Sequence, residues 1–360
     1  MLGEKHGEPG MPVLGTRCGW NVGVFKVFFC FLRQFGVFAI LVSAAVAAER
    51  TPLIVYSTLE PDYLAALKKA VEAEHADLDI IWQKDATGII TARLLAEKGE
   101  RGDAIWGLAA TSMMRLKKEG LLAPYAPANL AEIRAKFRDS DNPPFWIGID
   151  AWAGAVCFNT AEAEKLSLPH PASWYDLLDP GYRGRITMPD PGSSGTGYFH
   201  VSAWIQLFGE DEAWRFMDRL HLNIAAYSHS GTKPCRDAAV GEFPVGISYE
   251  LAGAQAKQNG APIDVLLMKE GSGWDMDGAA ILQATRRPEA ARRLLDFAAS
   301  RKANEVYASF VQQVAIEGVA KPIPFYPEGL SDSMIKNDLV WAFENRDRII
   351  AEWQRRYGTK

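Results

Sequence analysis

The chain has 360 residues, of which 48% are hydrophobic and 23% are charged, an ordinary globular composition with room for about two domains. Its formal net charge at pH 7 is −5. An acidic chain of this kind argues against nucleic acid and against anionic membrane surfaces as partners.

Residues 1–48 have the organisation of an export signal. Lys26 and Arg33 flank a short apolar segment, and residues 34–48 run from apolar to small side chains. This order predicts a secretory signal peptide that is cleaved near Ala48. The rival interpretation is a membrane anchor, but the apolar run is short for one and no charge cluster follows it. We therefore expect a periplasmic protein.

Strand and helix patterns alternate after this leader. Buried-strand patterns occur at residues 52–57, 78–82 and 103–106, and a segment with apolar residues at helical spacing follows each of them. The alternation predicts a parallel sheet, whose ligands bind beyond the carboxyl ends of the strands. The candidate binding residues near those ends are Tyr56, Ser57, Thr58, Glu60, Thr87 and Trp106.

Two apolar stretches interrupt this alternation. Residues 145–158 are extended and apolar, and a glycine-rich loop precedes a second apolar run near residues 271–281. We expect both stretches to cross between two lobes that enclose a cleft. The predicted lobes are residues 49–150 plus 279–320 for lobe 1, and residues 151–278 plus 321–360 for lobe 2.

A loop rich in glycine and hydroxyl groups, Asp190–Tyr198, stands between a short strand pattern and a helix pattern. Its glycines leave backbone N–H groups exposed, and its hydroxyls add donors at a helix N-terminus, which carries partial positive charge. The combination suits an anion such as phosphate, phosphonate, sulfate or carboxylate, although an ordinary capped turn also fits the loop alone. The candidate donors are Ser193, Ser194, Gly195 and Thr196.

A second stretch, Ser228–Pro234, has the same features. Ser230, Thr232 and Lys233 stand just before a predicted helix that Pro234 would open. Two hydroxyl-rich helix starts can hold one anion from two directions. We therefore expect a small anionic or zwitterionic ligand at this place.

The chain resembles the type II periplasmic solute-binding proteins of ABC importers, and more narrowly the branch with ferric-ion and 2-aminoethylphosphonate binding proteins. The resemblance is carried by Val55–Thr58, Ala86–Gly88, Asp190–Tyr198, Ser230–Thr232 and Asp237–Tyr249. It implies an α/β fold of two lobes, with parallel-rich sheets, helices and a double crossover hinge. It also implies a monomer that delivers its ligand to a permease and an ATPase, uses no cofactor and is not an enzyme.

The resemblance leaves two classes of ligand. Ferric-ion relatives carry two adjacent tyrosines where this chain has Tyr249–Glu250, which weakens ligation of Fe³⁺, and we expect no metal site. A phosphonate fits better, with 2-aminoethylphosphonate favoured, because its dianion needs many neutral donors and its ammonium needs a carboxylate or an aromatic face. The candidates for the ammonium end are Glu60, Tyr249, Glu250, Trp274, Asp275 and Asp277.

A secreted hydrolase that uses Ser193 or Ser194 is the alternative from another class. The sequence has no G-x-S-x-G nucleophile elbow and no evident catalytic constellation, so we expect no catalytic residue. Cys157 and Cys235 are the cysteines that lie outside residues 1–48. They could pair in an oxidising compartment or stay free, and the sequence leaves both states open.

Overall fold

The structure, a computed structural model, describes residues 50–360. The predicted signal peptide lies outside the described residues and stays a prediction. Among residues 50–360, no helix combines the length and the apolar character needed to cross a membrane.

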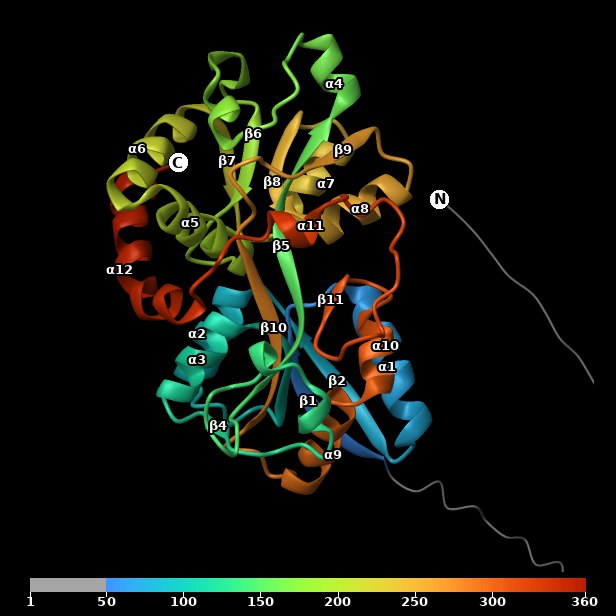
Figure 1. Ribbon diagram of the computed structural model, residues 1–360. Helices are drawn as coiled ribbons and strands as arrows, with labels where there is room; N and C mark the ends of the chain where they lie inside the picture. The colour runs from blue at the N-terminus through green and yellow to red at the C-terminus, as the bar shows by residue number, and fades with distance from the viewer. Residues whose placement is uncertain (1–49) are drawn as a thin grey trace, which may run out of the picture. The chain divides into compact units, whose positions relative to one another are not determined.

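Strands and helices alternate through most of the described chain (Figure 1). Their order is β1 (Thr51–Ser57), α1 (Pro61–Glu74), β2 (Leu78–Lys84), α2 (Thr87–Ala96), β3 (Ala104–Ala109), α3 (Ala110–Lys118), β4 (Leu122–Ala123), β5 (Ile147–Asn159), α4 (Thr160–Lys165), β6 (Ile186–Pro189), α5 (Gly195–Phe208), α6 (Glu210–Asn223), β7 (Ile224–Ser228), α7 (Lys233–Ala239), β8 (Val245–Tyr249), α8 (Glu250–Gln258), β9 (Ile263–Leu266), β10 (Trp274–Leu282), α9 (Pro288–Ala298), α10 (Arg301–Tyr307), β11 (Gln313–Val314), α11 (Leu330–Ser333) and α12 (Leu339–Tyr357).

The strands form two parallel-rich groups that are joined in the middle. Strand β1 pairs in parallel with β2 and β3, and β6 pairs in parallel with β7 and β8. The antiparallel strands β10 and β5 lie between the groups, so that the order is β2-β1-β3-β10-β5-β8-β6-β7. The predicted α/β fold is confirmed, and the two groups are joined through a strand that takes part in both.

Strand β5 is the element that both groups share. Its first part pairs with β10, with Asp150 opposite Asp277, and its second part pairs with β8, with Val156 opposite Ile247. Nearly every residue of β5 is buried, as its long apolar sequence predicts. Strands β5 and β10 occupy the two stretches for which the sequence predicted crossovers (Figure 1).

Two large hydrophobic cores lie on the two sides of this junction. The first core contains Leu53 and Trp106, and the second contains Trp204 and Trp353. Tyr326 packs in the first core although the sequence assigned residues 321–360 to lobe 2. The exact division of the chain into lobes stays a prediction.

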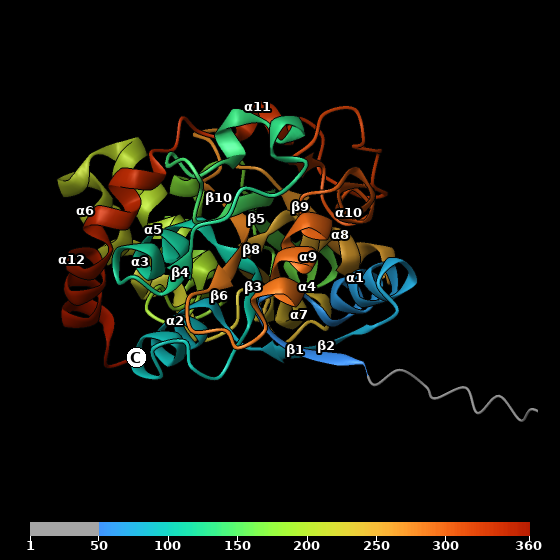
Figure 2. The same ribbon diagram turned by 90° about the horizontal axis from the view of Figure 1, so that it is seen from below.

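Helix packing ties the last helix to the first half of the chain. Helix α12 packs with the second core and also lies beside α3 (Figures 1 and 2). The Arg115 guanidinium on α3 and the Asp347 carboxylate on α12 form an ion pair of 2.6 Å. Because the Asp347 side chain is 72% exposed, solvent screens this pair, and it contributes little to stability by itself.

The carboxyl ends of the strands bring three helix starts toward one place. Strands β6 and β7 are in register at their last residues, Pro189 and Ser228, so the loops that lead into α5 and α7 begin side by side. Helix α2 follows β2 in the same manner, and the Gly88 N–H near its start donates to the Ser193 carbonyl over 2.8 Å. The fold thus joins the two predicted anion loops to the start of α2.

Candidate ligand-binding site

A cavity of about 410 Å³ lies at these helix starts. Residues of α1, α2 and β5 line it together with the loops that precede α5 and α7. A volume in this range is typical of sites for small molecules. Of the residues predicted from the sequence, the cavity is lined by Thr58, Glu60, Thr87, Ser194, Gly195, Thr196, Ser230, Thr232, Tyr249 and Asp277.

The loop before α5 is held by its own side chains. The Asp190 carboxylate accepts from the N–H groups of Gly192 and Ser193 over 2.9 and 3.1 Å. Ser194 caps the helix by accepting from the Gly197 N–H over 3.4 Å. Gly195 and Thr196 are the first residues of α5, where N–H groups have no intrahelical acceptor. Helix geometry therefore leaves two N–H donors at the cavity for a bound anion.

The loop before α7 touches the first loop directly. A Cβ atom placed on Gly231 would lie 2.2 Å from the Thr196 Oγ1 atom and 2.8 Å from the Thr196 Cβ atom. Only a glycine allows this approach, because both distances are far below ordinary contact. The Ser248 hydroxyl on β8 donates to the Gly231 carbonyl over 2.7 Å and fixes the loop to the sheet.

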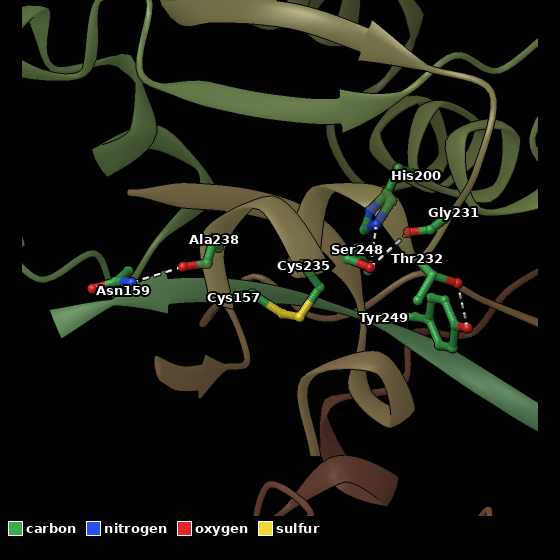
Figure 3. The surroundings of a disulfide bond; sticks show 9 residues. All are labelled: Cys157, Asn159, His200, Gly231, Thr232, Cys235, Ala238, Ser248 and Tyr249. Carbon is green, nitrogen blue, oxygen red and sulfur yellow. Dashed lines mark hydrogen bonds between the residues drawn. A yellow bond between two sulfur atoms is a disulfide. The ribbon is translucent and has the colours of Figure 1, made fainter. Parts of the chain in front are cut away.

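A disulfide between Cys157 and Cys235 fixes the start of α7 to β5 (Figure 3). The structure thereby decides the question that the sequence left open. The Asn159 side chain adds a hydrogen bond of 2.7 Å to the Ala238 carbonyl at the other end of α7. Because the loop that contains Gly231 leads directly into α7, these bonds also position that loop.

Thr87, the first residue of α2, adds a hydroxyl from the half of the fold that contains β1, β2 and β3. A Cβ atom on Gly195 would lie 2.7 Å from the Thr87 Oγ1 atom, so the start of α2 stands against the start of α5. Thr58 also lines the cavity, but its hydroxyl donates to the Gly107 carbonyl over 2.9 Å. The cavity therefore joins hydroxyls from three helix starts, two from one half of the fold and one from the other.

Charged side chains of both signs surround these hydroxyls. Arg236, Lys84 and Asp85 line the cavity together with Glu60. The Glu60 carboxylate accepts from the Thr232 hydroxyl and lies 3.9 Å from the Lys84 ammonium. Local charge is therefore mixed, which suits a ligand that has both an anionic and a cationic part.

Several predicted residues do not line the cavity because they serve the first core or the loop itself. The Trp106 indole donates to the Tyr307 hydroxyl over 2.9 Å inside the core. Tyr56 is buried beside Glu97, and the Ser57 hydroxyl accepts from the Leu59 N–H over 3.2 Å. The Ser193 hydroxyl lies 3.0 Å from the His229 ring nitrogen Nδ1.

Other predicted residues point away from the cavity toward structural partners. The Lys233 ammonium pairs with Asp237 at 2.6 Å on α7. The Trp274 indole donates to the Ile335 carbonyl over 2.9 Å. The Asp275 carboxylate accepts from the Thr111 hydroxyl over 3.0 Å at the start of α3, and burial raises the pKa of Asp275 to about 6.

Glu250 bears directly on the choice between iron and a phosphonate, because it stands where the ferric-ion relatives carry their second tyrosine. Its carboxylate accepts from the Ala153 N–H over 2.8 Å and from the Tyr326 hydroxyl over 2.9 Å. Burial raises the pKa of Glu250 to about 7. Tyr249 faces the cavity while Glu250 is held in the protein interior.

The sequence prediction missed residues that reach the cavity from other elements. They include Asp150 and Trp152 on β5, Arg236 on α7, His229 and Lys84. The two residues on β5 carried a signal, because an aspartate and a tryptophan stand among the glycine, alanine and isoleucine residues of its first part. Arg236 lies two residues past the predicted motif Ser228–Pro234.

The floor of the cavity holds two aspartates. Asp150 and Asp277 are opposite each other on β5 and β10, and both line the cavity although they are almost fully buried. The Tyr63 hydroxyl donates to Asp150 over 2.6 Å. Burial raises the pKa of Asp150 to about 7, and burial and the neighbouring Asp150 raise the pKa of Asp277 well above its usual range.

Comparison with known proteins gives consistent matches. Residues 107–324 match the model of a family described as bacterial extracellular solute-binding protein. A probable ABC transporter periplasmic-binding protein of Sinorhizobium fredii is 26% identical over 310 residues, which cover 83% of this chain and 81% of that protein.

Two solved structures extend the comparison. The structure of the periplasmic binding protein AfuA from Actinobacillus pleuropneumoniae, with exogenous fructose-6-phosphate bound, is similar with a TM-score of 0.79 and 28% identity; the match covers 86% of this chain and 99% of that chain. Iron-bound HitA from Pseudomonas aeruginosa has a TM-score of 0.70 at 21% identity, covering 84% of this chain and 99% of HitA. The likeness to HitA shows the fold alone.

Proposed function

The chain belongs to the family of bacterial extracellular solute-binding proteins, and we propose that it binds a small organic phosphonate or phosphate ester for an ABC importer. In this proposal the exported protein, without residues 1–48, carries its ligand as a monomer to a permease and an ATPase. The similarity to the Sinorhizobium fredii protein supports the importer part of the proposal.

One observation carries the choice of ligand: three hydroxyl-bearing helix starts meet around one cavity. Thr87, the loop Ser194–Thr196 and the loop Ser230–Thr232 line one cavity with hydroxyl and N–H groups, which suits a single anion there. A dianion that leaves water needs such donors, because without them its desolvation cost is not recovered. Each hydrogen bond to a charged group contributes about 1.5–3 kcal/mol, so six donors offset the cost and leave micromolar or tighter affinity.

The size of the ligand follows from the cavity. A volume of about 410 Å³ has room for 2-aminoethylphosphonate and also for a larger body on the same phosphorus group. We favour 2-aminoethylphosphonate because carboxylates and aromatic rings line the cavity beside the hydroxyls. Sugar phosphate is the rival within this class, and the AfuA structure with bound fructose-6-phosphate supports it.

Ferric ion is a less suitable ligand for the same site. Tyr249 keeps the position of one phenolate ligand, but its hydroxyl lies 3.1 Å from the Thr232 hydroxyl, and Glu250 bonds inside the protein. Residues 50–360 contain no group of three or more His, Cys, Asp or Glu side chains arranged to hold a metal ion. A site for a phosphorus dianion accounts for more of the hydroxyl groups that line the cavity than an iron site does.

A hydrolase is the candidate from another class, and one contact favours it. The Ser193 hydroxyl lies 3.0 Å from the His229 ring, as in a nucleophile and base pair. The Asp190 carboxylate accepts from the Ser193 hydroxyl over 3.4 Å and makes no hydrogen bond to the far side of His229 within residues 50–360. A base that is not oriented by a third group is a poor catalyst, and we therefore prefer binding without turnover.

A thermal-shift panel on residues 49–360 tests the proposal. The panel comprises 2-aminoethylphosphonate, ethylphosphonate, fructose 6-phosphate, phosphate, sulfate, putrescine and Fe³⁺. A ligand at 100 times its dissociation constant adds about 2.7 kcal/mol of stability, or roughly 5 °C for a chain of this length. Stabilisation by phosphonates or phosphate esters without product formation supports the proposal. Stabilisation by Fe³⁺ or putrescine alone, or release of phosphate, contradicts it.

A further inference from the structure

The aspartates at the cavity floor have unused hydrogen-bonding capacity. Asp150 is fully buried and Asp277 is 6% exposed, yet the Oδ1 atom of each accepts no hydrogen bond within the described part of the chain. The Trp152 indole lines the same cavity beside Asp277. Buried polar atoms without partners are costly in a folded protein, so the two carboxyl oxygens point to a ligand that supplies donors.

No ion pair of the described chain compensates these two carboxyl groups. None of the ion pairs among residues 50–360 includes Asp150 or Asp277, whereas Asp79 and Asp139 are paired with lysines. The cations that line the same cavity are Lys84 and Arg236. The titratable groups that surround the pair are phenols and further acids from the neighbouring elements: Tyr63, Tyr249, Glu250, Asp275, Tyr307 and Tyr326.

Two buried carboxyl groups that lie opposite each other cannot both hold a charge without compensation. In the free protein the pair therefore keeps one proton, in agreement with the raised pKa of both groups. Such a pair has net charge −1, and the lone pairs that the shared proton does not occupy can accept further hydrogen bonds. An ammonium group matches it, because it brings one positive charge and three N–H donors.

We propose that Asp150 and Asp277 form an acidic subsite that binds a protonated primary amine of the ligand. The inference rests on the proposed function for the other end of the molecule, where the hydroxyl loops hold the phosphorus dianion. The ligand is then a zwitterion that spans the cavity, and the aromatic faces of Trp152 and Tyr249 flank its cationic end.

Binding of the amine should be accompanied by proton release, which a pair of acids with a purely structural role would not show. The positive charge of a bound ammonium lowers the pKa of both carboxyl groups, so the pair gives up part or all of its shared proton to solvent while the ammonium keeps its three hydrogens. Binding of an aminated ligand therefore releases up to one proton per chain near pH 7, and its affinity increases as the pH rises from 6 to 8. Binding of an analogue without the amine releases no proton from this pair.

Titration calorimetry with 2-aminoethylphosphonate and ethylphosphonate, which differ by the amine, tests the inference. We expect the wild-type protein to prefer the aminated ligand by at least about tenfold. Asp277→Asn should reduce this preference to within about threefold by weakening only the aminated ligand. Glu250→Gln is the matched control, a buried acid outside the cavity lining, and should keep the preference. An unchanged preference in Asp277→Asn, or equal weakening of both ligands, overturns the inference.

Two further measurements separate this inference from the proposed function. Proton release by the wild-type protein is measured in buffers of different ionisation enthalpy, which needs no variant and covers the case that Asp277→Asn does not fold. If neither phosphonate nor fructose 6-phosphate binds, the proposed function fails, and putrescine then probes the subsite alone. Putrescine binding that Asp277→Asn abolishes keeps the acidic subsite, whereas no binding, or binding that persists in Asp277→Asn, overturns it.

Discussion

The contact between the two hydroxyl loops makes Gly231→Ala a sharp test of the anion site. The added methyl group would lie 2.2 Å from the Thr196 Oγ1 atom and 2.8 Å from its Cβ atom, so the loops must separate by about 1 Å. A shift of that size breaks the hydrogen bonds that either loop makes to a shared anion. Loss of two bonds at about 1.5–3 kcal/mol each weakens binding by at least about 100-fold.

Titration calorimetry with the best phosphorus ligand of the panel measures this loss. Gly181→Ala is the control, because it adds the same methyl group at a surface turn away from the cavity, 3.0 Å from an Asp179 side-chain atom. The thermal midpoint of Gly231→Ala shows whether the fold is kept. A folded Gly231→Ala protein with wild-type affinity would refute the reasoning that the two loops hold one anion.

The remaining predictions concern the hydroxyls, the disulfide and one buried acid. Thr196→Ala and Ser230→Ala should each weaken the phosphorus ligand at least about tenfold in calorimetry, because each removes a hydrogen bond to a charged group; unchanged affinity in both contradicts the anion site. Cys157→Ser or Cys235→Ser should lower the free energy of unfolding by about 4 kcal/mol in urea titrations, since the bond closes a loop across 78 positions of sequence, and a reductant should reproduce the loss in the wild type only. Folded Glu250 keeps its proton up to a pKa of about 7, whereas an unfolded glutamate releases it near 4.5, so wild-type stability should fall between pH 5 and 7. Glu250→Gln should remove about 3 kcal/mol of that fall, and an equally steep pH dependence in the variant would contradict the buried position of this group.

The sequence predicted the parts of the site that depend on local chemistry. Glycines and hydroxyls at a strand-to-helix junction specify a loop with free N–H groups wherever the junction lies, and Ser194–Thr196 and Ser230–Thr232 line the cavity. The fold class was also predictable, because the alternation of strand and helix patterns is regular. The two loops meet at one cavity because β6 and β7 pair in parallel with their last residues in register, and no local pattern encodes this pairing.

The parts that the sequence prediction missed depend on contacts between distant segments. Asp150 reaches the cavity floor because β5 pairs with β10, and Glu250 is withdrawn from it because Ala153 and Tyr326 bind its carboxylate. Trp106 stands at the carboxyl side of a strand, as a binding residue would, but its indole finds Tyr307 in the core. In each case the partner is far away in the sequence, so residue type and spacing could not identify it.

A crystal structure of residues 49–360 with 2-aminoethylphosphonate tests the central claim most directly. The account predicts the phosphorus group within hydrogen-bonding distance of Thr87, Thr196 and Ser230, and the amine within hydrogen-bonding distance of Asp277. A fructose 6-phosphate complex should place its phosphorus group at the same three hydroxyls. A ligand bound elsewhere, or a cavity that stays free of it at saturating concentration, would contradict the account.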